Sequence, residues 1–292
     1  MYIWKKIKSD KLAGVCLFFL VTIILLGVIA PVAAPNDPVE TNITEKLSGI
    51  SLQYPFGTDQ LGRCIFSRLL YGIRTTVWMS IWTTLATISI GTILGFVSGY
   101  FRGWIDEIIM RLCDVMLSFP SEVMILAIVG MLGPGLGNIV IANIIAKWAW
   151  YTRMIRSIVI QYMDKNYISF AKVVGGSPFH IMKNHLLPGS LGEIVVLASL
   201  DTGAVILSVS ALSFLGLGVQ APTPEWGMML NEAKNIMITH PTKMIPPGIA
   251  ILAVVAAFNF IGDKVRDIMD PKHMDRRVKN NEFVESGESV CS

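Results

Sequence analysis

Residues 167–188, YISFAKVVGGSPFHIMKNHLLP, form a polar and basic stretch between two long apolar runs. Apolar and polar residues alternate at helical spacing on both sides of Gly175 and Gly176. Glycine tolerates the positive φ that a sharp turn between helices requires. The stretch is therefore predicted to be two short helices joined by a turn, with Pro188 ending the second helix before the next apolar run begins.

The composition indicates a membrane protein. Only 15% of the 292 residues are charged and 53% are hydrophobic, which is far from a soluble enzyme of this length. Pro134 and its flanking glycines predict a break between the third and fourth apolar runs. The sequence thus predicts an all-α integral membrane protein with six transmembrane helices. Runs long enough to cross a hydrocarbon core of about 30 Å lie near residues 12–31, 77–99, 121–141, 138–158, 190–215 and 246–262.

The first run resembles a signal peptide because lysines precede it. Its apolar part has about 20 residues, against the 7–15 of a signal sequence, so we expect an uncleaved span. Most of the 24 lysines and arginines then fall on one side, which the positive-inside rule assigns to the cytoplasm together with both termini. The expected parts are an N-terminal end with the first span (1–34), an extracytoplasmic segment (35–74), a transmembrane core (75–268) with a cytoplasmic loop (163–188), and a cytoplasmic tail (269–292).

Sites for several other kinds of chemistry are not recognisable in the sequence. No G-x-x-x-x-G-K-[ST] phosphate-binding loop occurs, and no acid–base cluster converges at one depth. The four cysteines and four histidines are dispersed, so neither a disulfide framework nor a metal site is predicted. The net charge of +3 lies mostly in the cytoplasmic flanks and does not indicate nucleic-acid binding. We expect no cofactor and no enzymatic activity.

Two polar segments on the outer side have patterns of their own. Thr58 or Asp59 can cap a helix whose Leu61, Ile65 and Leu69 recur every four residues, which predicts an amphipathic helix lying against the membrane. Residues 213–234 predict an irregular approach to a short helix that begins near Pro224. Plain surface loops remain the alternative for both segments.

Two ionisable residues fall within predicted spans, Lys147 in the fourth and Asp201 in the fifth. An unpaired charge at bilayer depth costs about 2.5–3.5 kcal/mol on insertion scales, so both must face protein or water. They either pair with each other and stabilise the packing, or line a translocation path. Elsewhere, Gly91, Gly95 and Gly99 repeat on one face of the second span, which predicts close helix packing.

Several motifs, taken in order, resemble those of a known family. They are FGTDQLGR (56–63), MRLCDVMLSFPS (110–121), the 167–188 loop, LSFLGLGVQAPTPEWG (212–227) and AFNFIGDKVRDIMDP (257–271). The pattern is similar to the permease subunits of the dipeptide, oligopeptide and nickel ABC importers over residues 1–272. KWAWYTRMIRS (147–157), LASLDTGAVIL (197–207) and APTPEWGMMLNEAK (221–234) most resemble the second, C-type permease of nickel or metal-chelate systems.

The resemblance implies a type I ABC importer permease in the bacterial plasma membrane. Its partners would be a second permease, two ATP-binding subunits, an extracytoplasmic substrate-binding protein and the lipid bilayer, with no nucleic acid. The 167–188 loop resembles the "EAA" coupling loop that seats in the ATPase. Ser169, Phe170 and Ala171 stand at the Glu-Ala-Ala positions, where only Ala171 matches. The other coupling residues that the resemblance implies are Gly175, Gly176, His185, Leu187 and Pro188.

The implied function is movement of nickel or a metal chelate across the membrane, driven by ATP hydrolysis on partner subunits. Import of dipeptides or oligopeptides is the alternative within the family. A stand-alone secondary transporter is the competing class, since such proteins have broken helices near the midplane; the break at 133–137 fits that pattern, but no internal repeat is found. Neighbouring genes for a second permease, two ATPases and a lipoprotein would favour the importer.

Overall fold

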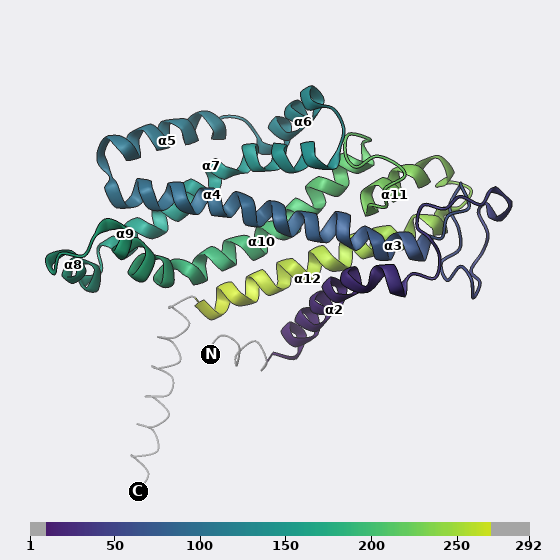
Figure 1. The fold of residues 1–292 in the computed structure, drawn as a ribbon, viewed down its shortest axis with the longest axis horizontal. Coiled ribbons are helices and arrows are strands. Elements are labelled where there is room, and N and C mark those ends of the chain that lie inside the picture. The colour runs from purple at the N-terminus through teal and green to yellow at the C-terminus, as the bar shows by residue number, and fades with distance from the viewer. Residues whose placement is uncertain (1–9, 270–292) are drawn as a thin grey trace, which may run out of the picture.

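The computed structural model describes residues 10–269, so the expected cytoplasmic ends 1–9 and 270–292 lie outside the described residues. The described part consists of helices and connecting loops (Figure 1). Its α-helices are α2 (Lys11–Ala33), α3 (Ile65–Ile73), α4 (Met79–Phe101), α5 (Gly103–Leu117), α6 (Ser121–Leu132), α7 (Leu136–Met163), α8 (Asn166–Val173), α9 (Pro178–Ile181), α10 (Leu187–Phe214), α11 (Trp226–Ala233) and α12 (Ile245–Met269).

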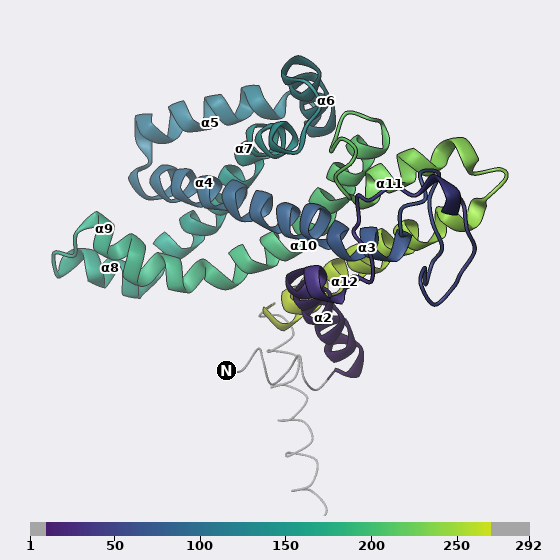
Figure 2. The ribbon, with the colours of Figure 1, turned by 45° about the vertical axis from the view of Figure 1, so that its right-hand side comes forward.

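The long helices run roughly along one axis, and the short ones gather at the two ends. Helices α8 and α9 lie at one end, here called the α8 end, whereas α11 and the loops of residues 35–64 lie at the other, the α11 end (Figures 1 and 2). The chain passes back and forth between these ends. The all-helical bundle expected from the composition is therefore confirmed.

Four helical segments are long and apolar enough to cross a membrane by themselves: Lys11–Ala33, Ile65–Phe101, Pro178–Phe214 and Pro241–Ile268. Helices α5 and α6 make a fifth if they are counted as one span, bent by 81°. Helix α7 has 28 residues, about 42 Å at 1.5 Å per residue, which is long enough for a further pass, although α7 is not among the segments that are also apolar enough to be counted. The arrangement is consistent with the six expected spans.

The third pass differs from the expected span at 121–141. Helix α6 has only 12 residues, about 18 Å, which is too short for a hydrocarbon core of about 30 Å. Positive φ values at Gly133 and Gly135 end it and start α7, so the predicted break is confirmed. The missing length comes from α5, which precedes the apolar run expected at 121–141. Its helix contacts α4 and α7.

Charged side chains on α7 are paired with acids on neighbouring helices. Lys147 lies 2.9 Å from Asp201 of α10, and Arg156 lies 2.5 Å from Asp106 of α5. Arg153 pairs with Asp114, also on α5. Because an opposite charge offsets much of the cost of burying an ion, α7 can carry Lys147 and Arg156 within the bundle, whereas the Arg153–Asp114 pair is exposed.

Helices α4 and α7 approach closely through the predicted glycine face. A Cβ atom added at Gly91 would lie 2.4 Å from the Cβ of Tyr151, and one added at Gly99 would lie 2.7 Å from Val159. Gly95 faces Ile155 in the same way. Such distances leave no room for a side chain, so the prediction that this repeat serves packing is confirmed.

Two helices are longer than the sequence indicated. The chain is helical without interruption from Ile65 to Phe101, so the helix expected to lie against the membrane is instead the end of the second span at the α11 end. Likewise Pro178–Phe214 is continuous, and the prediction that Pro188 ends a helix is wrong. A π-helical turn at Met182–Leu186 precedes this proline, and the N–H of Leu187 bonds to the carbonyl of Met182. The wider turn lets the helix pass a residue that lacks an N–H.

Candidate functional site

The two ionisable residues within the spans meet in the bundle. Lys147 Nζ donates to Asp201 Oδ1 at 2.9 Å, and the hydroxyl of Tyr151 donates to Asp201 Oδ2 at 2.6 Å. Lys147 and Tyr151 are four residues apart on α7, so they lie on one helix face and both reach the same carboxylate. The Lys147 and Asp201 side chains are only 12% and 16% exposed. Pairing, one of the two sequence-based alternatives, is therefore present.

The same pair also lines a cavity of about 250 Å³. Its lining also includes Phe119 and Glu122, at the bend between α5 and α6. The cavity is thus bounded by a paired charge on two long helices and by the break in the third pass. The pair therefore both stabilises the packing and faces a cavity, and its role in lining a translocation path stays a prediction.

The loop of residues 163–188 has the expected helix-turn-helix form, and one side of it is anchored in the bundle. Ile168 of α8, Ile181 of α9 and Leu186 of the π turn are at most 1% exposed and pack with Met163 of α7. Tyr162 of α7 donates a hydrogen bond to the carbonyl of Gly189 at 2.8 Å. These contacts hold α8 and α9 against the ends of α7 and α10.

The opposite side of the loop carries exposed apolar side chains. Phe170 and Phe179 are 69% and 70% exposed, and Val173 and Val174 are exposed beside them. These four residues are here called the α8–α9 face. An exposed apolar patch on a rigidly anchored element is typical of a protein–protein contact.

The residues assigned to coupling by resemblance all lie in this region. Gly175 has φ +87° with open space where a Cβ would stand, whereas a Cβ at Gly176 would lie 2.8 Å from the carbonyl oxygen of Ala171. The positive φ at the turn is therefore confirmed for Gly175, and a close approach holds for Gly176. Phe170, Ala171, both glycines and His185 line one cavity of about 620 Å³. Outside that cavity are Ser169, Leu187 and Pro188, which are exposed.

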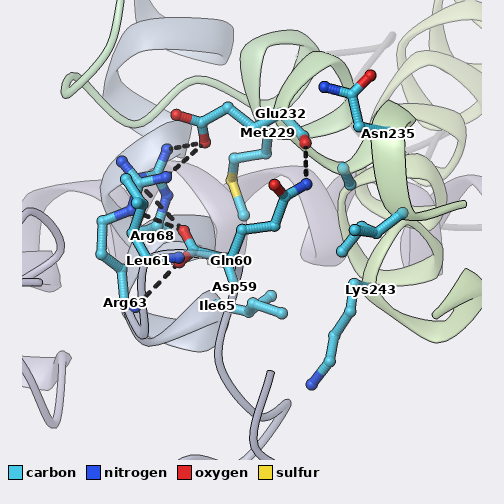
Figure 3. A pocket seen from close by; sticks show the side chains of 12 residues that line it. Asp59, Gln60, Leu61, Arg63, Ile65, Arg68, Met229, Glu232, Asn235 and Lys243 are labelled. Atoms are coloured by element: carbon cyan, nitrogen blue, oxygen red, sulfur yellow. Dashed lines mark hydrogen bonds and ion pairs between the residues drawn. The ribbon is translucent and has the colours of Figure 1, made fainter. Parts of the chain in front are cut away.

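A third cluster, at the α11 end, was not found from the sequence. Arg63 Nε lies 2.7 Å from Asp59 Oδ2, and Arg63 Nη2 lies 2.9 Å from Glu232 Oε2. Arg68 Nη2 also lies 2.7 Å from Glu232 Oε2 (Figure 3). Gln60 donates to the carbonyl oxygen of Glu232 at 2.6 Å. The network joins the loop of residues 35–64 and α3 to α11 across more than 160 residues of sequence.

Glu225 forms a second link at the α11 end. Its carboxylate is fully buried and accepts the N–H of Met228 at 2.7 Å, which caps α11. It also accepts the hydroxyls of Thr76 at 3.0 Å and Ser210 at 3.3 Å. The short helix expected near Pro224 therefore begins at Trp226 and is tied to the second span and to α10.

The pairing of Glu225 with Thr76 and of Glu232 with Arg68 could not be assigned from spacing, because 149 and 164 residues separate the partners. The only local signal was the FGTDQLGR motif, whose Asp59 and Arg63 are four residues apart. Within residues 10–269, no group of three or more His, Cys, Asp or Glu side chains is placed to hold a metal ion.

Comparisons with known proteins agree with this architecture. A family model described as the binding-protein-dependent transport system inner membrane component matches residues 91–274. A second model, the N-terminal TM domain of oligopeptide transport permease C, matches residues 1–55.

Similar proteins cover nearly the whole chain. The metal-staphylopine import system permease protein CntC of Staphylococcus aureus is 45% identical over 93% of this chain and 94% of its own length. The dipeptide transport system permease DppC of Alkalihalophilus pseudofirmus is 41% identical over 92% and 88%. The glutathione transport system permease GsiD of Escherichia coli is 38% identical over 92% and 89%.

A solved structure shares the fold. A chain of the inward-facing MetNI methionine ABC transporter superposes with a TM-score of 0.57 at 16% identity, covering 70% of this chain and 98% of that one. The type I importer permease fold implied by the motifs is confirmed. Together with the family models and relatives, this shows that the chain belongs to the binding-protein-dependent transport system inner membrane components and is a permease subunit of an ABC importer rather than an enzyme.

Proposed function

We propose that this permease moves a metal chelate, such as a nickel complex, into the cell, using ATP hydrolysed on partner subunits. The observation that carries the proposal is the 45% identity, over 93% of the chain, to a permease named for metal-staphylopine import. Import of short peptides is the second candidate, supported by the 41% identity to a dipeptide permease. The partners would be a second permease, two ATP-binding subunits and an extracytoplasmic binding protein.

The α8–α9 face is the proposed contact with an ATP-binding subunit. Its four apolar side chains are exposed, while Ile168 and Ile181 anchor the same helices in the bundle. A force applied to this face would therefore reach α7 and α10 directly. In this assignment the α8 end is cytoplasmic and the α11 end is extracytoplasmic, as the distribution of lysine and arginine favours.

The proposed path passes the cavity beside Lys147 and Asp201. These side chains belong to α7 and α10, the two helices that continue from the ends of the α8–α9 segment. Movement at the α8 end would then alter the spacing between them. Because a carboxylate and an ammonium can each exchange a partner for a polar cargo, the pair is suited to a gate as well as to packing.

A matched pair of variants tests the coupling surface. Phe170→Ser removes an exposed apolar side chain from the α8–α9 face, and Ile238→Ser removes one that is 91% exposed near the α11 end. Phe170→Ser should weaken co-purification of the ATP-binding subunit and lower transport, whereas Ile238→Ser should leave co-purification unchanged. Equal co-purification for both variants, at equal membrane abundance, would refute the assignment.

The cargo is tested by uptake in cells that lack this gene and in cells that carry it again. Uptake of radioactive nickel presented with a chelating ligand should require the gene, and uptake of a labelled dipeptide should not. A requirement for dipeptide uptake alone would replace the chelate proposal by its alternative. Uptake of both substrates without the gene would contradict either assignment.

A further inference from the structure

An apolar groove lies between α2, α12 and the outer loop at the α11 end. Its volume is about 700 Å³, within the range of about 300–1,000 Å³ typical of ligand sites. The walls are almost entirely apolar. Residues that line it include Phe19 and Ile23 of α2, Phe56 of the loop, and Ile249 and Val254 of α12.

The groove reaches to the depth of one membrane leaflet. Along α12 its lining runs from Ile245 to Val254, nine steps of 1.5 Å, or about 14 Å. Half of a hydrocarbon core of about 30 Å is about 15 Å. On α2 the lining includes Ile23, next to the midpoint of the helix Lys11–Ala33, and Phe19, about one turn beyond it. The groove thus starts at the α11 end of the span and stops near the middle of the bilayer.

A cation without an acidic partner lies at the head of the groove. Lys243 lines it and is 8% exposed. Its Nζ donates to the carbonyl of Ser48 at 2.6 Å, and no carboxylate within residues 10–269 lies in ion-pair range. An ammonium group has three donors, so two remain for a further acceptor. Asp59 attracts this ammonium only from beyond ion-pair distance, and burial of an ammonium without a directly paired counterion is unfavourable, which favours an anionic group here.

The surroundings of the groove are those of a lipid-facing surface. Ile245, Ile249 and Leu252 of α12 are 52%, 58% and 69% exposed. Helix α2, on the other side, has 17% of its most apolar stretch buried. The groove therefore opens onto a surface of exposed apolar side chains, which is the kind of surface that faces lipid.

We propose that this groove binds one phospholipid from the leaflet at the α11 end. One acyl chain lies between α2 and α12, and the phosphate accepts from Lys243. A phospholipid fits both the apolar groove and Lys243. Its acyl chain has the length of one leaflet, and its phosphate supplies a negative charge to the ammonium group. A lipid with net negative charge is preferred over a zwitterionic one.

Two tryptophan substitutions three residues apart on α12 test the groove. Ala253 lines it, whereas Ala256 is exposed and lies outside it. Ala253→Trp fills the groove, and Ala256→Trp adds the same bulk to the open lipid-facing surface. The wild-type chain and both variants would be purified in detergent, mixed with phosphatidylglycerol or phosphatidylcholine, and examined by native mass spectrometry.

The wild-type chain and Ala256→Trp should each retain one phosphatidylglycerol, and Ala253→Trp should lose it. Lys243→Gln keeps a donor for the Ser48 carbonyl and removes the charge. It should reduce the preference for phosphatidylglycerol over phosphatidylcholine by about fivefold, the factor expected for one lysine near a lipid headgroup. Equal lipid retention in Ala253→Trp and Ala256→Trp would overturn the proposal.

A photo-crosslinking residue at Ile249, in the assembled transporter, tests for a different occupant. Cross-linking to phospholipid supports the site. A cross-link to another permease chain would overturn the proposal and assign the groove to a protein interface. Neither experiment measures transport, so failure of the lipid site and failure of the proposed import function are distinguishable.

Discussion

Replacing Asp201 by asparagine should destabilise the permease strongly, because it leaves Lys147 without its counterion. Asp201→Asn keeps an oxygen that can accept the hydroxyl of Tyr151, so the hydrogen bond that measures 2.6 Å in the wild type can still form. The Lys147–Asp201 pair of 2.9 Å does not. Lys147→Met is milder, because Asp201 retains the tyrosine hydroxyl. The expected order of damage is therefore Asp201→Asn above Lys147→Met.

The magnitude follows from the burial of the pair. Removing one partner of a buried ion pair costs about 3–5 kcal/mol. Lys147 and Asp201 are 12% and 16% exposed beside a cavity, so the lower end, about 3 kcal/mol, applies. At 1.36 kcal/mol per tenfold change, this is about a 100-fold change in the ratio of folded to unfolded protein. The double variant, with neither charge, should recover most of that loss.

The assay is thermal unfolding of the purified chain, together with its abundance in the membrane. Wild type, both single variants and the double variant form a cycle that isolates the interaction between the two residues. Uptake is measured at matched abundance. The pairing role predicts that the double variant regains stability and transport together.

Two results would separate or refute these roles. If the single variants unfold like the wild type but lose uptake, and the double variant does not regain uptake, the pair lines the translocation path and does not stabilise the packing. Wild-type stability and uptake in both single variants would refute the reasoning altogether, because the two charges would then be hydrated independently.

The remaining predictions concern packing, the turn and topology. Gly91→Ala should destabilise the α4–α7 contact by about 1–3 kcal/mol in thermal unfolding, since its Cβ would lie 2.4 Å from that of Tyr151, while Gly130→Ala, which has open space, should not. Gly175→Val, at φ +87°, should leave the protein inserted but lower transport, and normal uptake would contradict the coupling role. A cysteine at Ile238 should react with an impermeant reagent from outside and one at Val173 only after permeabilisation; outside labelling of Val173 would reverse the proposed orientation.

Local features were predicted well because they depend on residues close together in the sequence. The turn at Gly175 requires only a residue that tolerates positive φ. The break after Leu132 needs only Gly133, Pro134 and Gly135. The glycine repeat of α4 predicted a close contact, although the sequence did not say that α7 supplies the other side.

Element boundaries were predicted less well, because hydropathy reports how apolar a window is and not where a helix starts. The second and fifth spans extend beyond their apolar cores at Ile65–Phe101 and Pro178–Phe214. For those extensions the sequence predicts separate short helices, an amphipathic one that includes Ile65 and Leu69 and a second one that ends at Pro188, rather than continuations of the spans. Pro188 was taken as a helix end, but a π-helical turn before it accommodates the missing N–H.

The sequence by itself determined the membrane class, the turn chemistry and, through its motifs, the family. Only the tertiary structure decided which charges meet. Lys147 reaches Asp201 across 54 residues, and Arg68 reaches Glu232 across 164. The physical reason is that periodicity and turn propensity act over a few residues, whereas the partner of a buried charge is set by how helices pack against one another.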